Sequence, residues 1–148
     1  MTISINEMTE DTARLVAELE AKCFNDPWPY ESFINTLSND HAQYYLCFLD
    51  GDFVGYVGMY NLIDEVSIIN VAVDPAYRGT GYGRMLMERA EDYAKGHGCP
   101  MMTLEVRESN TPARRLYEAC GYRIFGTQKN YYTNPKEDAI LYCKDIKC

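Results

Sequence analysis

The apolar positions in the first forty residues recur at helical spacing and predict two helices. The apolar face of the first consists of Leu15, Val16, Leu19 and Cys23, and that of the second consists of Phe33, Ile34 and Leu37. Thr9 is a suitable N-cap for the first helix. We expect this helix to end before residues 25–29, because that segment contains two prolines and proline removes a backbone donor.

Farther along the chain the pattern changes to β-rich apolar runs separated by turn residues. These runs predict strands at residues 44–49, 53–60, 66–73, 101–106, 122–128 and 139–144. Residues 50–52, Asp-Gly-Asp, are typical of a hairpin between the first two. Two more helices are expected, one ending at residues 96–98 and one running from Thr111-Pro112 to Gly121. This order favours an α/β fold with a mixed sheet and a parallel step in its middle.

Length and charge limit the classes of function. The chain has 148 residues, which suits a single domain spanning residues 1–148. Fourteen Lys and Arg against 22 Asp and Glu give a formal charge of −8. Such a balance argues against nucleic-acid binding, which needs clustered basic residues, and disfavours an anionic membrane surface. Basic peptides and cationic amines are compatible with it, as is an acidic surface that binds no partner.

Compartment and metal content follow from the same kind of reasoning. No apolar stretch approaches the ~18 residues of a membrane span, and polar residues near the N-terminus argue against a signal peptide, so we expect a cytoplasmic protein. The six cysteines form no C-x-x-C pair and have no nearby His in ligand spacing, which predicts reduced thiols and no metal site. Cys148, at the end of the chain, is expected to be exposed and oxidisable.

The most informative segment is residues 71–83, Val-Ala-Val-Asp-Pro-Ala-Tyr-Arg-Gly-Thr-Gly-Tyr-Gly. A strand is followed by three glycines at alternate positions and then by a helix. Glycine lets the backbone bend so that several N–H groups point at one spot, and the helix N-terminus adds positive potential that suits a pyrophosphate. Neither the Gly-Lys-Ser/Thr of a P-loop nor the acidic residue of the dinucleotide fingerprint is present. A tight turn that binds nothing is the alternative.

Residues 78–83, Arg-Gly-Thr-Gly-Tyr-Gly, match the (Arg/Gln)-x-x-Gly-x-(Gly/Ala) motif, and the chain resembles the GNAT N-acetyltransferases on this ground. Asn110, Ala113, Leu116-Tyr117 and Gly121-Tyr122 also fit that superfamily. Shorter segments resemble the bacterial Rim-type enzymes, which acetylate the N-terminal alanine of a ribosomal protein: Pro27-Trp28 and residues 104–107, 130–132 and 137–140. The resemblance implies the GNAT fold, a central, mostly antiparallel sheet with a parallel step and helices on both faces.

The resemblance also implies acetyl-CoA as co-substrate and assigns residues to it. The backbone of Val71, Ala72 and Val73 would pair with the pantetheine arm, much as a peptide adds to a free strand edge. The pyrophosphate would be held by the amides of Gly79, Thr80, Gly81, Tyr82, Gly83 and Arg84. Arg78 and Arg84 would bring positive charge to the phosphates. Asn110 would hydrogen-bond the coenzyme, with helix capping as its alternative role.

Acetyl transfer to an amine needs a base for the amine proton and an acid for the departing thiolate. Glu105 is the candidate base, because it alternates with Leu104 and Val106 and lies near the C-terminal end of its strand. The matching position in the Rim-type enzymes is the general base. Glu65 is the alternative base, since other GNAT members place theirs there. Tyr117 is the candidate acid, because a phenol stays protonated at pH 7.

The leading hypothesis is direct acetyl transfer without an acyl-enzyme, since no cysteine lies beside a histidine. The Rim-type resemblance implies the N-terminal alanine of small-subunit ribosomal protein eighteen as acceptor. Such a basic acceptor should bind more weakly as salt rises. Four aromatic residues are candidates either for an acceptor groove or for ordinary packing: Trp28, Tyr30, Tyr131 and Tyr132. The alternatives are another protein N-terminus, a small-molecule amine, or a non-catalytic module that senses acetyl-CoA.

Overall fold

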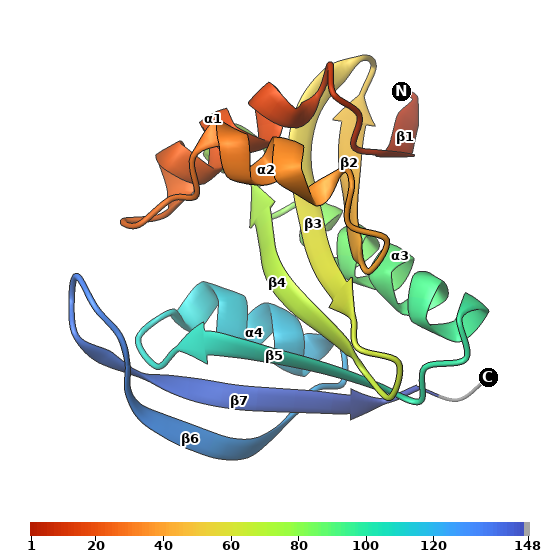
Figure 1. Cartoon of the computed structure of the whole chain (residues 1–148). Coiled ribbons are helices and arrows are strands. Elements are labelled where there is room, and N and C mark those ends of the chain that lie inside the picture. Colours follow the sequence, from red (N-terminus) through yellow and green to blue (C-terminus); the bar gives the residue numbers. More distant parts are fainter. Residues whose placement is uncertain (147–148) are drawn as a thin grey trace.

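One seven-stranded sheet runs through the molecule in the order β1-β2-β3-β4-β5-β7-β6 (Figure 1). The computed structural model describes residues 1–146. The strands are β1 (Ile3–Glu7), β2 (Ala42–Leu49), β3 (Asp52–Asn61), β4 (Val66–Val73), β5 (Met101–Arg107), β6 (Arg123–Tyr132) and β7 (Glu137–Asp145). The helices are α1 (Ala13–Cys23), α2 (Tyr30–Thr36), the short 3-10 helix η1 (Pro75–Tyr77), α3 (Tyr82–Gly96) and α4 (Thr111–Ala119).

The sheet is antiparallel everywhere except between β4 and β5, which confirms the expected mixed sheet with a parallel step. The parallel pairing is short: it joins Val66–Ile68 to Met102–Leu104 and then stops. Beyond that point the two strands diverge, as Figure 1 shows. Residues 69–73 of β4 therefore have a strand neighbour on one side only, which is β3. The divergence opens a gap in the middle of the sheet.

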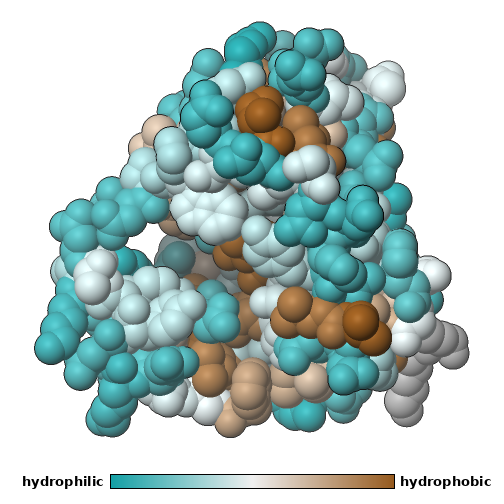
Figure 2. Space-filling view, viewed as in Figure 1, coloured by the Kyte–Doolittle hydropathy of each residue, from teal (hydrophilic) through white to brown (hydrophobic). Residues whose placement is uncertain are grey.

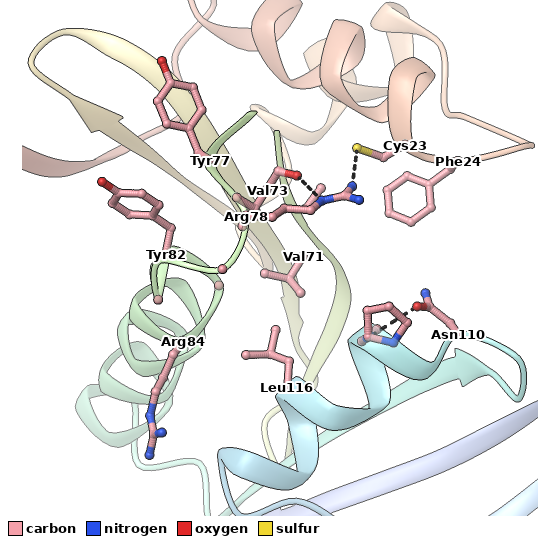
Figure 3. A pocket seen from close by; sticks show the side chains of 16 residues that line it. Cys23, Phe24, Val71, Val73, Tyr77, Arg78, Tyr82, Arg84, Asn110 and Leu116 are labelled. Carbon is pink, nitrogen blue, oxygen red and sulfur yellow. Dashed lines mark hydrogen bonds between the residues drawn. The ribbon is translucent and has the colours of Figure 1, made fainter. Parts of the chain in front are cut away.

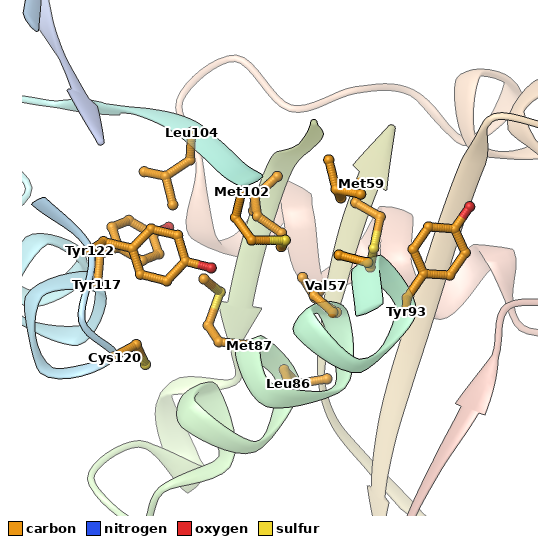
Figure 4. Packing of buried hydrophobic residues seen from close by; sticks show 14 of the residues in the cluster. Val57, Met59, Leu86, Met87, Tyr93, Met102, Leu104, Tyr117, Cys120 and Tyr122 are labelled. Atoms are coloured by element: carbon orange, nitrogen blue, oxygen red, sulfur yellow. The ribbon is translucent and has the colours of Figure 1, made fainter. Parts of the chain in front are cut away.

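Helices cover both faces of the sheet and produce two apolar cores, as the fold class implies. The core beneath α3 and α4 contains Leu86, Met87, Ala90, Tyr93, Tyr117 and Cys120 from these helices (Figure 4). The core on the other face contains Val16 and Leu19 from α1 and Phe33 from α2. Three of the apolar positions that predicted these two helices are buried there, because their spacing places them on one helical face, whereas Leu37 is exposed. Burying them against the sheet fixes where each helix lies.

Besides shifts of one or two residues at several strand ends, three features differ from the predictions. Strand β1 was not predicted: its sequence Ile-Ser-Ile-Asn-Glu is mostly exposed, and only its pairing with β2 makes it a strand. Helix α1 begins at Ala13 with Thr12 as N-cap, whereas the Thr9 carbonyl accepts the amides of Thr12 and Ala13 at 3.1 and 3.0 Å. Thr9 therefore begins a turn before the helix. Strand β6 extends to Tyr132, four residues beyond its predicted end, because β7 pairs with it.

Five cysteines are free thiols: Cys23, Cys47, Cys99, Cys120 and Cys143. The prediction about Cys148 lies outside the described residues. Within residues 1–146 no cluster of three or more His, Cys, Asp or Glu side chains could hold a metal ion. No helix in the same range is long and apolar enough to span a membrane.

Candidate active site

The glycine-rich turn between β4 and α3 forms the first part of the site. Gly79 and Gly81 have φ values of +82° and +93°, a left-handed conformation in which glycine is favoured because it has no Cβ. Gly83 serves a different purpose, since a Cβ there would come within 3.1 Å of Leu116 on α4. The glycines thus allow both the backbone bend and the close approach of the two helices.

The turn presents a row of free backbone donors. No acceptor within residues 1–146 takes a hydrogen bond from the amides of residues 79–84, and the first amide bonded to this turn is that of Met85, which donates to the Gly81 carbonyl at 3.1 Å. The first amides of a helix have no intrahelical partner and carry its positive dipole end. Six consecutive free N–H groups beside the 15-residue helix α3 suit an anion such as a pyrophosphate.

These donors border a cleft of about 440 Å³, called here the first cleft (Figure 3). Ten of the eleven residues predicted to bind the coenzyme line it: Val71, Ala72, Val73, Arg78, Gly79, Gly81, Tyr82, Gly83, Arg84 and Asn110. The side chain of Thr80, the exception, turns back and donates to the Tyr77 carbonyl at 2.7 Å. The structure therefore brings together residues from β4, the turn, α3 and α4, and a chain-like ligand could extend from the turn along β4.

The arginines and Asn110 at this cleft are partly engaged already. Arg78 Nε donates to the Val73 carbonyl at 3.0 Å, and its guanidinium also contacts Cys23 Sγ at 3.5 Å (Figure 3). Arg84 forms an exposed ion pair with Glu88 at 3.7 Å. Asn110 Oδ1 caps α4 by accepting the Ala113 amide at 3.2 Å. Its amide nitrogen donates to no acceptor in the described part of the chain, so capping leaves this donor available to the cleft.

A second cleft, of about 510 Å³, lies where β4 and β5 diverge. It is lined by Glu20, Phe24, Asn25, Asp26, Trp28, Tyr60, Ser67, Ile68, Ile69, Asn70, Glu105, Arg107, Tyr131, Tyr132 and Thr133. Phe24 lines both clefts, and β4 passes from one to the other between Asn70 and Val71. The predicted base Glu105 is exposed here on β5. Of the four candidate aromatic residues, all but Tyr30 line this cleft.

Two loops meet over the second cleft. Asn134 Nδ2, between β6 and β7, donates to Asp26 Oδ1 at 3.1 Å, and Asn25 Nδ2 donates to the Asn134 carbonyl at 3.4 Å. The Arg107 guanidinium donates to the carbonyls of Thr133 and Pro135 in the β6–β7 loop, both at 2.8 Å. Figure 2 shows the surface hollowed between these two loops. The cleft is thus open but bridged at its rim.

The pKa of Tyr132 reflects the burial and the charges at the second cleft. Burial, and then the negative charge of Glu105, raises the pKa of Tyr132 to about 12. The guanidinium of Arg107 lies 4.4 Å from the centre of the same ring. Tyr132 therefore keeps its proton at neutral pH, and the Glu105 carboxylate lies close enough to contribute to the raised pKa of Tyr132.

Tyr117, the predicted acid, lies in the core beneath α3 and α4 and lines neither cleft (Figure 4). Burial raises the pKa of its phenol well above the usual value. Its hydroxyl makes no hydrogen bond to any other described residue, yet no buried side-chain oxygen or nitrogen there lacks a partner. The hydroxyl must therefore touch open space.

Glu65, the alternative base, lies elsewhere. It lies just before the start of β4, where β4 and β5 are paired, and accepts a hydrogen bond from the Thr103 hydroxyl. It lines neither cleft. Of the two predicted candidates for the base, Glu105 is therefore the one that lines a cleft.

Among the residues of the second cleft that sequence reasoning did not single out, two are hydrogen-bonded to each other. Glu20 is buried and Asn70 is half-buried, and their side chains are hydrogen-bonded at 3.2 Å across 50 positions of sequence. In the sequence alone, neither residue differs from an ordinary polar residue of a helix or a strand. A polar residue on the buried face of α1 is the one signal that could have drawn attention to Glu20.

Comparison with known proteins agrees with this geometry. Residues 13–122 match the model of a protein family described as "Acetyltransferase (GNAT) family". The chain belongs to the GNAT acetyltransferase family. Its members are acetyltransferases that use acetyl-CoA, so this GNAT chain is an N-acetyltransferase with acetyl-CoA as co-substrate.

Individual proteins are similar to this chain over most of its length. A Bacillus subtilis (strain 168) protein is 39% identical over 127 residues, which are 85% of this chain and 84% of that protein. The N-alpha-acetyltransferase RimI of Mycobacterium tuberculosis is 35% identical over 149 aligned positions, which cover 97% of this chain and 92% of that protein. The crystal structure of the ribosomal-protein-S18-alanine N-acetyltransferase from Escherichia coli superposes with a TM-score of 0.89 at 28% identity, covering 99% of this chain and 96% of that one.

Proposed function

We propose that this enzyme transfers the acetyl group of acetyl-CoA to the α-amine of the N-terminal alanine of ribosomal protein bS18. Relatives from several bacteria carry the name [ribosomal protein bS18]-alanine N-acetyltransferase, and the Escherichia coli one is 34% identical over 98% of this chain. The observation that carries the proposal is the meeting of two clefts along β4, one with free backbone donors and one with a carboxylate. A coenzyme and an amine could meet there.

The first cleft would bind the co-substrate. The six free amides of residues 79–84 would hold its pyrophosphate, and the unpaired edge of Val71, Ala72 and Val73 would receive the pantetheine amides as an added strand would. The Val73 carbonyl is now bonded to Arg78, so we expect the Arg78 side chain to move toward the phosphates when the co-substrate binds. Asn110 Nδ2 would donate to the pantetheine.

The second cleft would bring the amine to the thioester. The amine nitrogen forms a bond with the acetyl carbon, the carbon–sulfur bond breaks, and the amine loses one proton. Glu105 would take that proton, directly or through a water. Tyr117, whose raised pKa keeps its hydroxyl protonated, would return a proton to the departing thiolate. The protons balance, and no covalent enzyme intermediate is needed.

Charge and composition are consistent with such an acceptor. Asp26 and Glu105 line the second cleft, and the whole chain carries a net charge of −8. Negative charge at the cleft favours the basic N-terminal segment of a ribosomal protein. We further propose that residues 1–148 form one domain, because its sheet is continuous, and that it acts in the cytoplasm without binding nucleic acid or a membrane.

A direct assay tests the proposal. The enzyme is mixed with acetyl-CoA and a peptide that begins with the first residues of bS18, and the peptide mass is measured. We expect one acetyl group on the α-amine and none when the peptide is already blocked there. Matched peptides that begin with other residues define the breadth. Acetylation of small amines alone would replace this function with that of a small-molecule transferase, and binding of acetyl-CoA without any transfer would indicate a sensing module.

A further inference from the structure

A buried carboxylate of α1 joins three segments at the wall of the second cleft. Glu20 is 2% exposed. Its Oε1 accepts the Tyr56 hydroxyl at 2.5 Å and Asn70 Nδ2 at 3.2 Å, and its Oε2 accepts the Trp28 amide at 2.6 Å. Charge-assisted hydrogen bonds of this kind are short and strong. Glu20 therefore ties β3, β4 and the loop after α1 to one point beside the cleft.

This carboxylate determines which way the Asn70 amide faces. Glu20 Oε1 accepts a hydrogen bond from Asn70 Nδ2, so the NH₂ group of Asn70 points toward Glu20. Asn70 Oδ1 must then point away from it. No donor among residues 1–146 bonds to that oxygen, and no buried side-chain oxygen or nitrogen in that range is left unpaired. Asn70 Oδ1 is therefore a free acceptor in contact with open space.

The backbone places Asn70 on the wall of the second cleft. Gly58 pairs with Asn70 and Met59 pairs with Ile68, so Ile69 is one extra residue in β4. Such a bulge changes the direction in which the neighbouring side chains point. Asn70 and Glu105 both line the second cleft, from the two strands that diverge there.

We propose that Asn70 Oδ1 accepts a hydrogen bond from the α-amine of the acceptor, and that Glu20 is the positioning residue that keeps this oxygen turned toward the cleft. The inference rests on the proposed transfer to an amine. It assigns to Asn70 the orientation of the attacking nitrogen, a task separate from the removal of its proton by Glu105.

A neutral acceptor suits this task. An amine held by one N–H to a carbonyl oxygen can still give another proton to a base and keep its lone pair for attack. A second carboxylate in the same place would favour the charged ammonium, because an opposite charge stabilises the ionised form. Asn70 can orient the nitrogen with much less of this effect.

The test compares three variants in the peptide assay. Asn70→Ala removes the acceptor, and we expect the KM of the peptide to rise roughly 10-fold, as for loss of one hydrogen bond. In Glu20→Gln, the carbonyl oxygen of the new glutamine must accept from the Trp28 amide. The NH₂ group of the glutamine then faces Asn70 and draws Asn70 Oδ1 away from the cleft. We expect a similar rise in peptide KM. The double variant should lose no more than either single variant.

Controls separate this role from general damage. The dissociation constant of acetyl-CoA should stay within about twofold for all three variants, since Asn70 and Glu20 line only the second cleft. Gln43→Ala removes a surface amide–carboxylate bond, Gln43 Nε2 to Glu7 Oε1 at 3.0 Å, and should leave the peptide KM unchanged. If Glu20→Gln does not fold, Asn70→Ala alone decides.

Two results would overturn the inference: an unchanged peptide KM and kcat/KM in Asn70→Ala, or losses in the double variant that multiply. Both leave the proposed function intact, because they require a wild-type enzyme that acetylates peptides. If the wild-type enzyme acetylates only small amines, the proposed function fails. The same variants are then measured with the amine that is accepted, and the same two results decide about Asn70.

Discussion

The two clefts share strand β4 but are built from different materials. The first presents the free backbone amides of residues 79–84 and is drawn mostly from residues 71–84, with further residues from the end of α1 and from α4. The second is mostly side chains, drawn from α1, β3, β4, β5, β6 and two loops. Backbone amides recognise a pyrophosphate whatever the neighbouring side chains are, whereas side chains can be exchanged to suit another acceptor. One cleft is therefore suited to a constant co-substrate and the other to a selected amine.

The largest expected effect concerns the chemistry between the clefts. Glu105→Gln and Tyr117→Phe should each lower kcat by roughly 10²- to 10⁴-fold, because each removes a proton-transfer group without changing shape. Acetyl-CoA affinity should not change, since neither side chain lines the first cleft. Steady-state kinetics and calorimetry measure the two effects separately. Glu65→Gln is the matched control, and a loss of kcat there with none in Glu105→Gln would make Glu65 the base.

The pH profile should distinguish the clefts next. A peptide α-amine has a pKa of roughly 7.7–8.0, so kcat/KM for the peptide should rise roughly 40-fold between about pH 6 and pH 8. No fall should follow up to about pH 10. Burial raises the pKa of Tyr117, which means that this acid keeps its proton as the pH rises. Tyr132, with a pKa raised to about 12, also stays neutral.

Acetyl-CoA binding should be nearly flat over the alkaline half of that range, because backbone amides do not titrate. A descending limb centred below about pH 9 would require an acid other than Tyr117. The Tyr117→Phe variant checks this assignment, since it should lower the whole profile without moving its midpoint.

The first cleft can be changed by itself through its backbone. Gly81→Ala places a Cβ at φ +93°, which costs about 1–2 kcal/mol, although the Cβ would meet no atom within 4 Å. We expect acetyl-CoA affinity to fall roughly 10-fold, because distortion of the turn misdirects its amides. The KM of the peptide should stay unchanged. Gly51→Ala is the matched control, with φ +88° and an equally open surrounding in the β2–β3 turn. It should cost similar stability without changing acetyl-CoA affinity.

The same contrast explains what the sequence could and could not predict. The bend of the turn was predictable because Gly79 and Gly81 meet a backbone requirement that is local in sequence, whereas Gly83 is required by its contact with Leu116 on α4. Glu105 was predictable from strand alternation and the family resemblance. Its surroundings were not, because they depend on where the parallel pairing stops, after only three residue pairs.

The Glu20–Asn70 pair shows the limit most clearly. Its two residues are 50 positions apart, and only the packing of α1 on the sheet brings them together. Strand β1 was missed for the same kind of reason, since an exposed five-residue edge becomes regular only by pairing with β2. Long-range pairing, rather than local pattern, decides both features.

The smallest expected effect concerns the bridge over the second cleft. Asp26→Ala removes the hydrogen bond from Asn134 Nδ2 and should raise the peptide KM by about 2- to 5-fold, as for one partly solvated hydrogen bond. Acetyl-CoA affinity should not change. Asp26→Asn keeps an acceptor oxygen at the same place and should restore most of the peptide KM. If Asp26→Asn is as impaired as Asp26→Ala, the negative charge of Asp26 is what the peptide requires. The bridge would then play no part in holding the acceptor, and the second cleft would select its substrate by charge.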